Sequence, residues 1–470
     1  MSAPLIWIGL PAFIGGILFL TRGYRLTTGI FGGILSALLA VSAWLLPIDE
    51  VVPLGSRAFE IGDRFSILGR DFLLLNTDRA WLLLIYLFLT MWIIGSLFAR
   101  PHSGFVSFGF VFTALLVAAL AVEPFLYAAL LIEIAVLLAV PFLLPPGSQP
   151  GRGIYRFLAF QTLGMPFILL AGWFLAGLEA SPGDSALVLR AGGLIGFGLA
   201  FLLAVVPFHS WIPTLIEECE PYLVSFILFM LPAFVAVFGL GFLDRFVWLR
   251  ESEGVYAGLR IVGMLMILVG GAWVAVERHL GRMLGYAAII EIGAGLMAVG
   301  IGSSEGVLLF FWMLFVRIFS AMPWAASVSW LQEESGIGLE LPNLVGFGHR
   351  YPIAAGILVS GGFSLAGLPL LAGFGAKFAF WQAISSDSPV LSLAALAGNT
   401  GLVIASLRAL NTLFISFPVQ QGDDQGVHNG AFYWLMVGLF GFLLFVIGLF
   451  PQVYITFIER LLFVFERLGA

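Results

Sequence analysis

The stretch Gly361-Gly-Phe-Ser-Leu-Ala-Gly-Leu-Pro-Leu-Leu-Ala-Gly-Phe-Gly-Ala-Lys377 interrupts a long apolar segment of the chain. Proline removes a backbone hydrogen-bond donor and glycine loosens a helix, so an apolar helix that contains both is expected to break. We place that break at Gly367 and Pro369. A lysine follows eight residues after the proline, which places it just beyond the break, where water could enter.

A second stretch of this kind, Ala204-Val-Val-Pro-Phe-His-Ser-Trp-Ile-Pro213, interrupts another apolar segment at Pro207. Pro207 and Pro369 lie 162 residues apart, and Glu133 and Glu291, two acids within apolar segments, lie 158 residues apart. The near-constant offset predicts two repeats, each with one broken helix. Paired broken helices in the halves of a transporter usually mark its ion path. The alternative is that both bends serve helix packing alone.

The composition places the whole chain in a membrane. Of its 470 residues, 61% are hydrophobic and only 10% are charged, whereas a water-soluble protein carries about 25% charged residues. The apolar residues form runs of about twenty, which is the length that crosses a bilayer as a helix, and the alternation typical of membrane strands is absent. We therefore predict an all-α integral membrane protein with about fourteen transmembrane helices. These are expected near 4–20, 27–47, 79–98, 105–121, 124–144, 155–177, 187–209, 223–243, 256–276, 283–301, 305–331, 351–384, 389–408 and 431–453.

Four regions follow from these spans. The segment Val51–Asp78 alternates polar and apolar residues and is expected to be an extramembrane hairpin, and Tyr454–Leu468 fits a helix at the membrane interface. The first apolar stretch, Pro4–Leu20, lacks a basic start and is interpreted as a span rather than a signal peptide. The regions are an N-terminal part (1–104), two five-helix repeats (105–243 and 256–408) and a C-terminal part (409–470).

The distribution of arginine predicts the orientation. Basic residues gather in alternate short connections, which assigns those connections to the cytoplasm and both termini to the opposite side. These residues are Arg22, Arg25, Arg100, Arg152, Arg156, Arg278, Arg282 and Arg350. The net charge of −6 and the lack of a basic run argue against a nucleic-acid partner. The only cysteine, Cys219, excludes intrachain disulfides and clusters held by several cysteines.

One lysine stands among the basic residues. Lys377 is the only lysine among 21 Lys and Arg residues. Arginine keeps its proton in proteins, whereas a desolvated lysine can release it. If a basic side chain relays protons here, it is Lys377.

At these residues the sequence resembles the proton-conducting membrane subunits of complex I, energy-converting hydrogenases and Mrp-type antiporters. Pro207-Phe-His-Ser-Trp-Ile-Pro213 is similar to the family signature PFHxWLP. Glu277-Arg-His-Leu-Gly-Arg-Met-Leu-Gly-Tyr-Ala-Ala-Ile289 resembles (D/Q)xxLKRLLAYSSI. Ser364-Leu-Ala-Gly-Leu-Pro-Leu-Leu-Ala-Gly-Phe-Gly-Ala-Lys377 is similar to SLAGLPPLAGFxGK and is the most specific match. The resemblance covers about 105–408.

The resemblance implies fourteen helices with two inverted five-helix repeats. It implies a subunit of a proton-translocating oxidoreductase or an antiporter assembly, with other membrane subunits and the lipid bilayer as partners and protons or Na⁺ as the transported ion. The chain itself shows no catalytic residues, metal site or cofactor site. The expected location is the inner membrane of a bacterium or archaeon.

Two residues match the family's charge-carrying positions. Glu133 corresponds to the fifth-helix glutamate, which in the family pairs with a lysine, and Lys377 to the basic residue of the broken twelfth helix, at the outward end of the proton path. Ionisable groups at mid-membrane are costly and are functional by default. The alternatives are a neutral, hydrogen-bonded Glu133 and a Lys377 that reaches toward the lipid headgroups.

Three further residues complete the predicted proton path. Arg317 falls where some relatives carry an eleventh-helix lysine, and Glu291 is either a central titrating group or the counter-ion of Arg317. His209 lies in the PFHxW signature, where it is either a proton gate or a structural anchor. The acids after it, Glu217, Glu218 and Glu220, are either a solvated face or a funnel for cations.

The first half departs from the family pattern. The seventh-helix lysine is replaced by Leu202, and the eighth-helix lysine would fall near Ala233 or Phe234. No Lys or Arg occurs between Arg190 and Arg245, so Glu133 has no lysine partner in its own half. We therefore expect a degenerate first half-channel.

Three functions remain open from the sequence. The chain translocates protons or cations within a larger complex, or it is a non-conducting subunit that anchors such a complex, or it is the proton-coupled subunit of an inorganic-carbon uptake complex. Co-purifying proteins discriminate among them: flavin or iron–sulfur subunits support the first, and a zinc protein supports the third.

Overall fold

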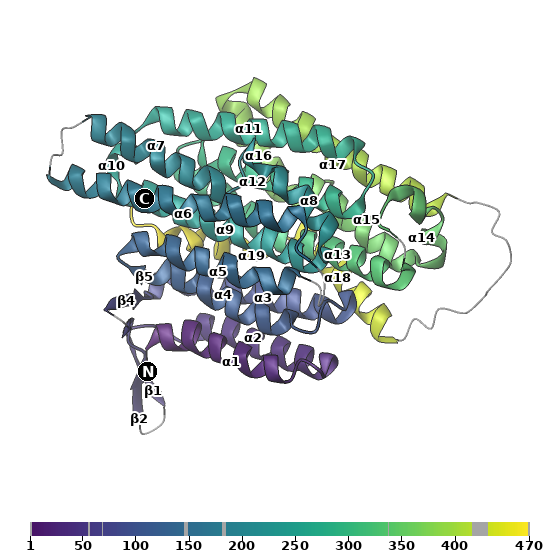
Figure 1. Ribbon diagram of the computed structural model, residues 1–470, viewed down its shortest axis with the longest axis horizontal. Coiled ribbons are helices and arrows are strands. Elements are labelled where there is room, and N and C mark those ends of the chain that lie inside the picture. The colour runs from purple at the N-terminus through teal and green to yellow at the C-terminus, as the bar shows by residue number, and fades with distance from the viewer. Residues whose placement is uncertain are drawn as a thin grey trace.

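The computed structural model describes residues 2–54, 57–67, 69–144, 149–180, 185–336, 338–415 and 431–468. Helices dominate, and most of them run side by side along one direction (Figure 1). The chain starts with α1 (Leu10–Leu20), α2 (Arg25–Leu45) and α3 (Arg79–Ala99). The next helices are α4 (Phe105–Ala121), α5 (Ala128–Leu143), α6 (Arg152–Ala180), α7 (Ser185–Leu202), α8 (Trp211–Glu218), α9 (Pro221–Arg245) and the short α10 (Val247–Arg250).

The second half of the chain is also helical. It contains α11 (Glu253–Val276), α12 (Leu280–Val299), α13 (Ser304–Ser335), the short α14 (Phe347–Arg350), α15 (Pro352–Ala366), α16 (Gly373–Asp387) and α17 (Pro389–Phe414). The chain closes with α18 (Ala431–Leu449) and α19 (Gln452–Leu461). The predicted division into two inverted five-helix repeats remains a prediction.

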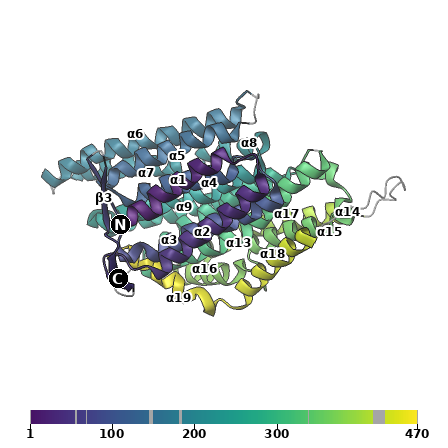
Figure 2. The ribbon, with the colours of Figure 1, turned by 90° about the horizontal axis from the view of Figure 1, so that it is seen from below.

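Three helices form the centre of the molecule. In α9, α12 and α13, 89% of the most apolar 18-residue stretch of each helix is buried inside the protein. The corresponding share in α6 and α7 is 28%. The three helices contact one another, whereas α6 and α7 lie at the periphery (Figure 2). Glu291 of α12 and Arg317 of α13 are buried in this centre rather than exposed to lipid.

Ten helices of the described residues are long and apolar enough to cross a membrane. Three shorter apolar helices lie at 5–20, 105–121 and 352–366, and a bent pair lies at 438–464. Helix length alone thus supports fewer spans than the fourteen expected. The count of fourteen remains a prediction.

Both predicted break regions are non-helical in the structure. α7 ends at Leu202, a single 3₁₀ turn spans Phe208–Ser210, and α8 then begins at Trp211. α15 ends at Ala366 and α16 begins at Gly373, so Gly367 and Pro369 lie in the gap between them.

The segment after α2 forms two antiparallel hairpins rather than one. β1 (Val51–Leu54) pairs with β2 (Arg57–Glu60), and β3 (Arg64–Ile67) pairs with β4 (Arg70–Leu73). β4 also pairs with β5 (Val122–Glu123), which joins the hairpin to the end of α4. Both labelled termini lie at this end of the molecule (Figures 1 and 2).

The C-terminal helix α19 turns away from its predecessor by 81°. Its Phe457 contacts the ring of Trp44 at the end of α2, at a centroid distance of 6.1 Å. A short helix at this angle fits the interfacial position that the sequence predicts for Tyr454–Leu468, which stays a prediction.

Candidate functional site

The gap between α15 and α16 is built around one glycine. Gly367 has a φ of +80°, a left-handed backbone that non-glycine residues rarely adopt. A Cβ on this residue would lie 2.9 Å from the Cβ of Lys377. Ser364 accepts a hydrogen bond from the Gly373 amide at 3.1 Å and its hydroxyl lies 2.7 Å from that of Ser320 on α13. The break therefore fixes Lys377 against the protein interior.

Lys377 forms a buried ion pair with Glu291. Its Nζ lies 2.6 Å from Oε1 of Glu291, and the two side chains are 4% and 3% exposed. Glu291 lies in the middle of α12, one of the three central helices. A lysine that leaves the protein for the lipid headgroups would be exposed, so this placement disfavours the headgroup interpretation of Lys377.

Arg317 lies beside this ion pair but does not form an ion pair of its own with a described residue. It is buried in α13 and lines, together with Glu291 and Lys377, a cavity of about 10 Å³. Among the described residues, no carboxylate lies within 4.0 Å of its guanidinium. Its nearest aromatic contact is the Phe229 ring, whose centroid is 5.9 Å away. The geometry therefore makes Lys377, not Arg317, the direct partner of Glu291.

The small cavity is close to the size of one water molecule. Its wall carries the hydroxyls of Ser320 and Ser364 besides the charged groups. On its other side, Glu291 and Arg317 border a second cavity of about 490 Å³, whose remaining lining is almost wholly apolar. The charged cluster thus separates a polar niche at the helix break from an apolar space.

Glu133, the acid of the first half, has a different environment. It is buried in α5, and its Oε1 accepts a hydrogen bond from the Thr162 hydroxyl of α6 at 2.8 Å. No cation of the described residues lies within 4.0 Å of it. Nearby on α6, Gln161 donates to the carbonyl of Leu202 at 3.2 Å. The side chains that bond next to Glu133 on α6 are therefore polar but uncharged.

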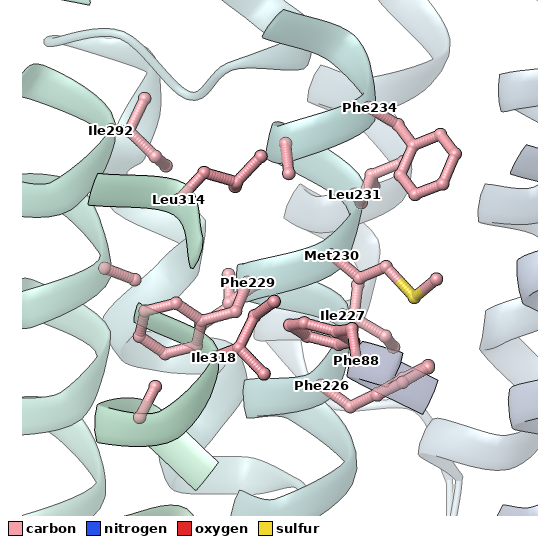
Figure 3. Packing of buried hydrophobic residues seen from close by; sticks show 14 of the residues in the cluster. Phe88, Phe226, Ile227, Phe229, Met230, Leu231, Phe234, Ile292, Leu314 and Ile318 are labelled. Carbon is pink, nitrogen blue, oxygen red and sulfur yellow. The ribbon is translucent and has the colours of Figure 1, made fainter. Parts of the chain in front are cut away.

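An apolar layer lies between the two acids. α9 contacts α5 on one side and α12 and α13 on the other, and all its residues from 226 to 243 are apolar. Figure 3 shows Phe226, Phe229 and Phe234 of this helix among side chains of neighbouring helices. Proton transfer needs titratable groups or water within hydrogen-bond reach, and this layer supplies no such side chain.

His209 and the acids after it take separate positions. His209 lies in the 3₁₀ turn before α8 and is half-buried, and its Nδ1 has no hydrogen-bond partner in the described part of the chain. Glu217 pairs with Arg282 at 3.6 Å, and Glu218 accepts a hydrogen bond from the Gly153 amide at the start of α6. Glu220 accepts one from the His102 amide at 3.0 Å. Each of these three acids therefore contacts a different element, and they do not form one face.

Sequence reasoning found the charged residues but missed their neutral partners. Thr162, Ser320 and Ser364 complete the two sites, and only Ser364 lies within a quoted motif. Serine and threonine are common in membrane helices, where they bond to their own backbone, so a lone hydroxyl gives no signal. Thr162 follows Gln161 directly, and this polar pair inside an apolar span is the signal that was available.

Comparison with known sequences shows similarity to membrane subunits of NADH:quinone oxidoreductases and Mrp antiporters. The family described as NADH:quinone oxidoreductase/Mrp antiporter, TM matches residues 178–404. NADH-quinone oxidoreductase subunit N of Parafrankia sp. is 28% identical over 270 residues, which make up 55% of this chain and 49% of that one. The subunit N of Salinispora arenicola is 29% identical over 251 residues, or 52% and 44% of the two chains. The chain thus spans about half the length of the curated relatives it matches.

Comparison with solved structures shows the same fold over nearly the whole chain. A chain of an archaeal membrane-bound sulfane sulfur reductase has a TM-score of 0.81 and 15% identity, covering 98% of this chain and 97% of that one. A chain of the Mrp complex from Dietzia sp. has a TM-score of 0.79 and 14% identity, covering 98% and 96%. A chain of respiratory complex I from Thermus thermophilus has a TM-score of 0.76 and 21% identity, covering 99% of each. The resemblance to antiporter-like membrane subunits is confirmed.

Proposed function

We propose that this chain, antiporter-like by its fold and by the family region at 178–404, translocates protons as a subunit of a complex I-type or Mrp-type assembly. In this proposal only the second half carries protons. The observation that carries it is the buried ion pair between Lys377 and Glu291 at the break of a membrane helix. Buried ionisable groups in a membrane interior are expensive, and they mark ion paths in transporters.

The three charges have complementary roles in this proposal. Lys377 can release its proton, whereas Arg317 keeps its charge. When Lys377 gives up its proton, Glu291 loses its direct counter-ion but still shares a cavity wall with Arg317. The fixed guanidinium charge then stabilises the carboxylate, so that a proton can leave the pair without leaving an uncompensated charge in the interior.

The first half does not take part in this transfer. Glu133 has a threonine hydroxyl instead of a cation as its partner, and α9 presents only apolar side chains between the two acids. The coupling proposed for the family requires a Glu–Lys pair, and Glu133 has no lysine in its own half with which to form one. We therefore infer a degenerate first half-channel, and protons enter the second half without passing Glu133.

Proton flux in liposomes that contain the purified native complex tests this function. Glu291→Gln should reduce coupled flux at least about tenfold, because it removes both the carboxylate charge and a proton-transfer group. Glu305→Gln, at an exposed acid in the first turn of α13, is the matched control and should leave flux unchanged. Co-purification of the partner subunits checks that the complex stays assembled. Equal flux in both variants would contradict the proposal.

The second candidate is a non-conducting subunit that anchors the complex. The apolar layer along α9 favours it, because this layer separates the acids of the two halves. This function predicts that Glu291→Gln leaves flux unchanged while deletion of the chain dissociates the complex. The same liposome experiment therefore separates the two candidates.

A further inference from the structure

A large apolar cavity lies between α7, α9, α11, α12 and α13. Its volume is about 490 Å³, which is within the range of sites that hold a small organic ligand. Its lining extends along α9 from Pro232 to Leu243 and along α12 from Glu291 to Val299. At 1.5 Å per residue these stretches are about 16 Å and about 12 Å long, so the cavity is elongated along the helices.

The cavity is open where two peripheral helices carry glycines. Gly193 and Gly196 of α7 and Gly258 of α11 line it, are exposed, and would place a Cβ in open space. α7 and α11 are candidate membrane spans, and 28% and 33% of their most apolar 18-residue stretches are buried inside the protein. The opening therefore faces the hydrocarbon of the bilayer, and apolar walls of this kind do not hold water well.

The inner end of the cavity carries an unbalanced charge. Glu291 is already paired with Lys377, whereas Arg317 is 6% exposed and has no carboxylate within 4.0 Å among the described residues. The Arg317 Nε is also without a hydrogen-bond acceptor there. The cluster of one carboxylate and two cations has a net charge of +1. A buried cation of this kind is stable only when an anion or several acceptors neutralise it.

We propose that this cavity binds a long-chain carboxylate, that is, a free fatty acid, with its carboxylate on Arg317 and its chain along the apolar walls. A guanidinium matches a carboxylate in a two-point hydrogen-bonded geometry, and the elongated apolar space matches a single alkyl chain. A phospholipid fits less well, because its phosphate would have to leave the membrane surface to reach Arg317. The site does not depend on whether the chain conducts protons.

Photolabelling of the full chain in lipid nanodiscs tests the site. The probe is hexadecanoate with a photoreactive diazirine in its chain, and labelled peptides are identified by mass spectrometry. We expect adducts on cavity residues such as Met313, Leu296 and Leu240, and competition by unlabelled hexadecanoate but not by hexadecan-1-ol. Equal competition by the alcohol would show that no carboxylate is recognised and would overturn the proposal.

Two variants locate the two parts of the ligand. Arg317→Gln should reduce labelling of the cavity at least about tenfold, because it removes the charge-assisted hydrogen bonds to the carboxylate. Gly196→Leu should reduce it similarly by filling the space, since a Cβ there meets nothing within 4 Å. Gly356→Leu adds the same side chain at an exposed position of α15 and should leave labelling unchanged. Labelling confined to outward-facing residues in every variant would show annular lipid only and overturn the proposal.

Discussion

Lys377 and Glu291 form an ion pair at 2.6 Å with side chains no more than 4% exposed, although they lie on helices separated by much of the second half of the chain. Burial of such a pair costs several kcal/mol for each ion, which the mutual attraction repays only in good geometry. A pair of this kind contributes little to stability by itself, but loss of one partner leaves a buried charge alone. This asymmetry yields the first prediction.

Glu291→Gln should destabilise the protein by about 3–5 kcal/mol, because it leaves the buried charges of Lys377 and Arg317 without a counter-ion. Lys377→Met should cost less, because Glu291 still shares a cavity wall with Arg317. The double variant should be destabilised by less than the sum of the two single effects. Thermal unfolding in nanodiscs, followed by intrinsic fluorescence, measures the four proteins of this cycle. Additive effects in the double variant would show that the two side chains do not interact.

Gly367→Ala should displace Lys377. The residue has a φ of +80°, and the new Cβ would lie 2.9 Å from the Cβ of Lys377. We expect a loss of about 1–3 kcal/mol from backbone strain, together with reduced proton flux. Thermal unfolding and liposome flux measure the two effects. Gly356→Ala, where a Cβ meets nothing within 4 Å, is the control. If both variants behave alike, the break does not hold Lys377 in place.

The sequence predicted the helical class, the break regions and the charged residues, because charges and prolines are conspicuous within apolar spans. It left the partner of Glu291 open between a titrating role and an ion pair with Arg317. Lys377 is that partner, and this depends on how α16 sits against α12, which no local pattern encodes. Pairing across helices separated in the chain follows from tertiary packing alone.

Thr162→Val should cost about 1 kcal/mol, because it removes the hydroxyl that bonds to Glu133 at 2.8 Å. Unfolding free energies measured for the purified chain check this. Thr400→Val is the control, since Thr400 is exposed and bonds only to its own helix. An unchanged stability in Thr162→Val would show that the hydrogen bond contributes nothing, and that Glu133 has another partner.

Glu220 should make stability depend on pH. Burial is the main cause that raises the pKa of this carboxyl from 4.5 to about 7, and the hydrogen bond from the His102 amide opposes it. Between these values the folded protein holds a proton that the unfolded chain has released. The protonated Glu220 therefore contributes fully to the free energy of unfolding below about pH 4.5. This contribution is lost as the pH rises to about 7, and the free energy of unfolding falls by up to about 1.4 kcal/mol per pH unit.

Melting temperatures across this pH range, for the wild type and for Glu220→Gln, measure the effect. The variant should show a weaker decline than the wild type, and Glu305→Gln should follow the wild type. Identical profiles for the wild type and Glu220→Gln would assign the pH dependence to another group.

The cavity could not be predicted from the sequence for a different reason. A cavity is an absence of side chains, and it arises where Gly193 and Gly196 of α7 and Gly258 of α11 leave room. Glycine is common in membrane helices, where it usually allows close packing, as at Gly263, which lies against Gly293. Glycine thus allows close packing of α11 on α12 but leaves a cavity between α7 and α11, depending on which side chains lie opposite it.

Proton flux in liposomes with the native complex, compared among wild type, Lys377→Ala and Glu133→Gln, tests the central claim most directly. The account predicts that Lys377→Ala abolishes coupled flux, because it removes the only lysine, while Glu133→Gln leaves it nearly unchanged. Loss of flux in Glu133→Gln would show that protons pass through the first half. Unchanged flux in Lys377→Ala, with the complex still assembled, would contradict conduction by the second half.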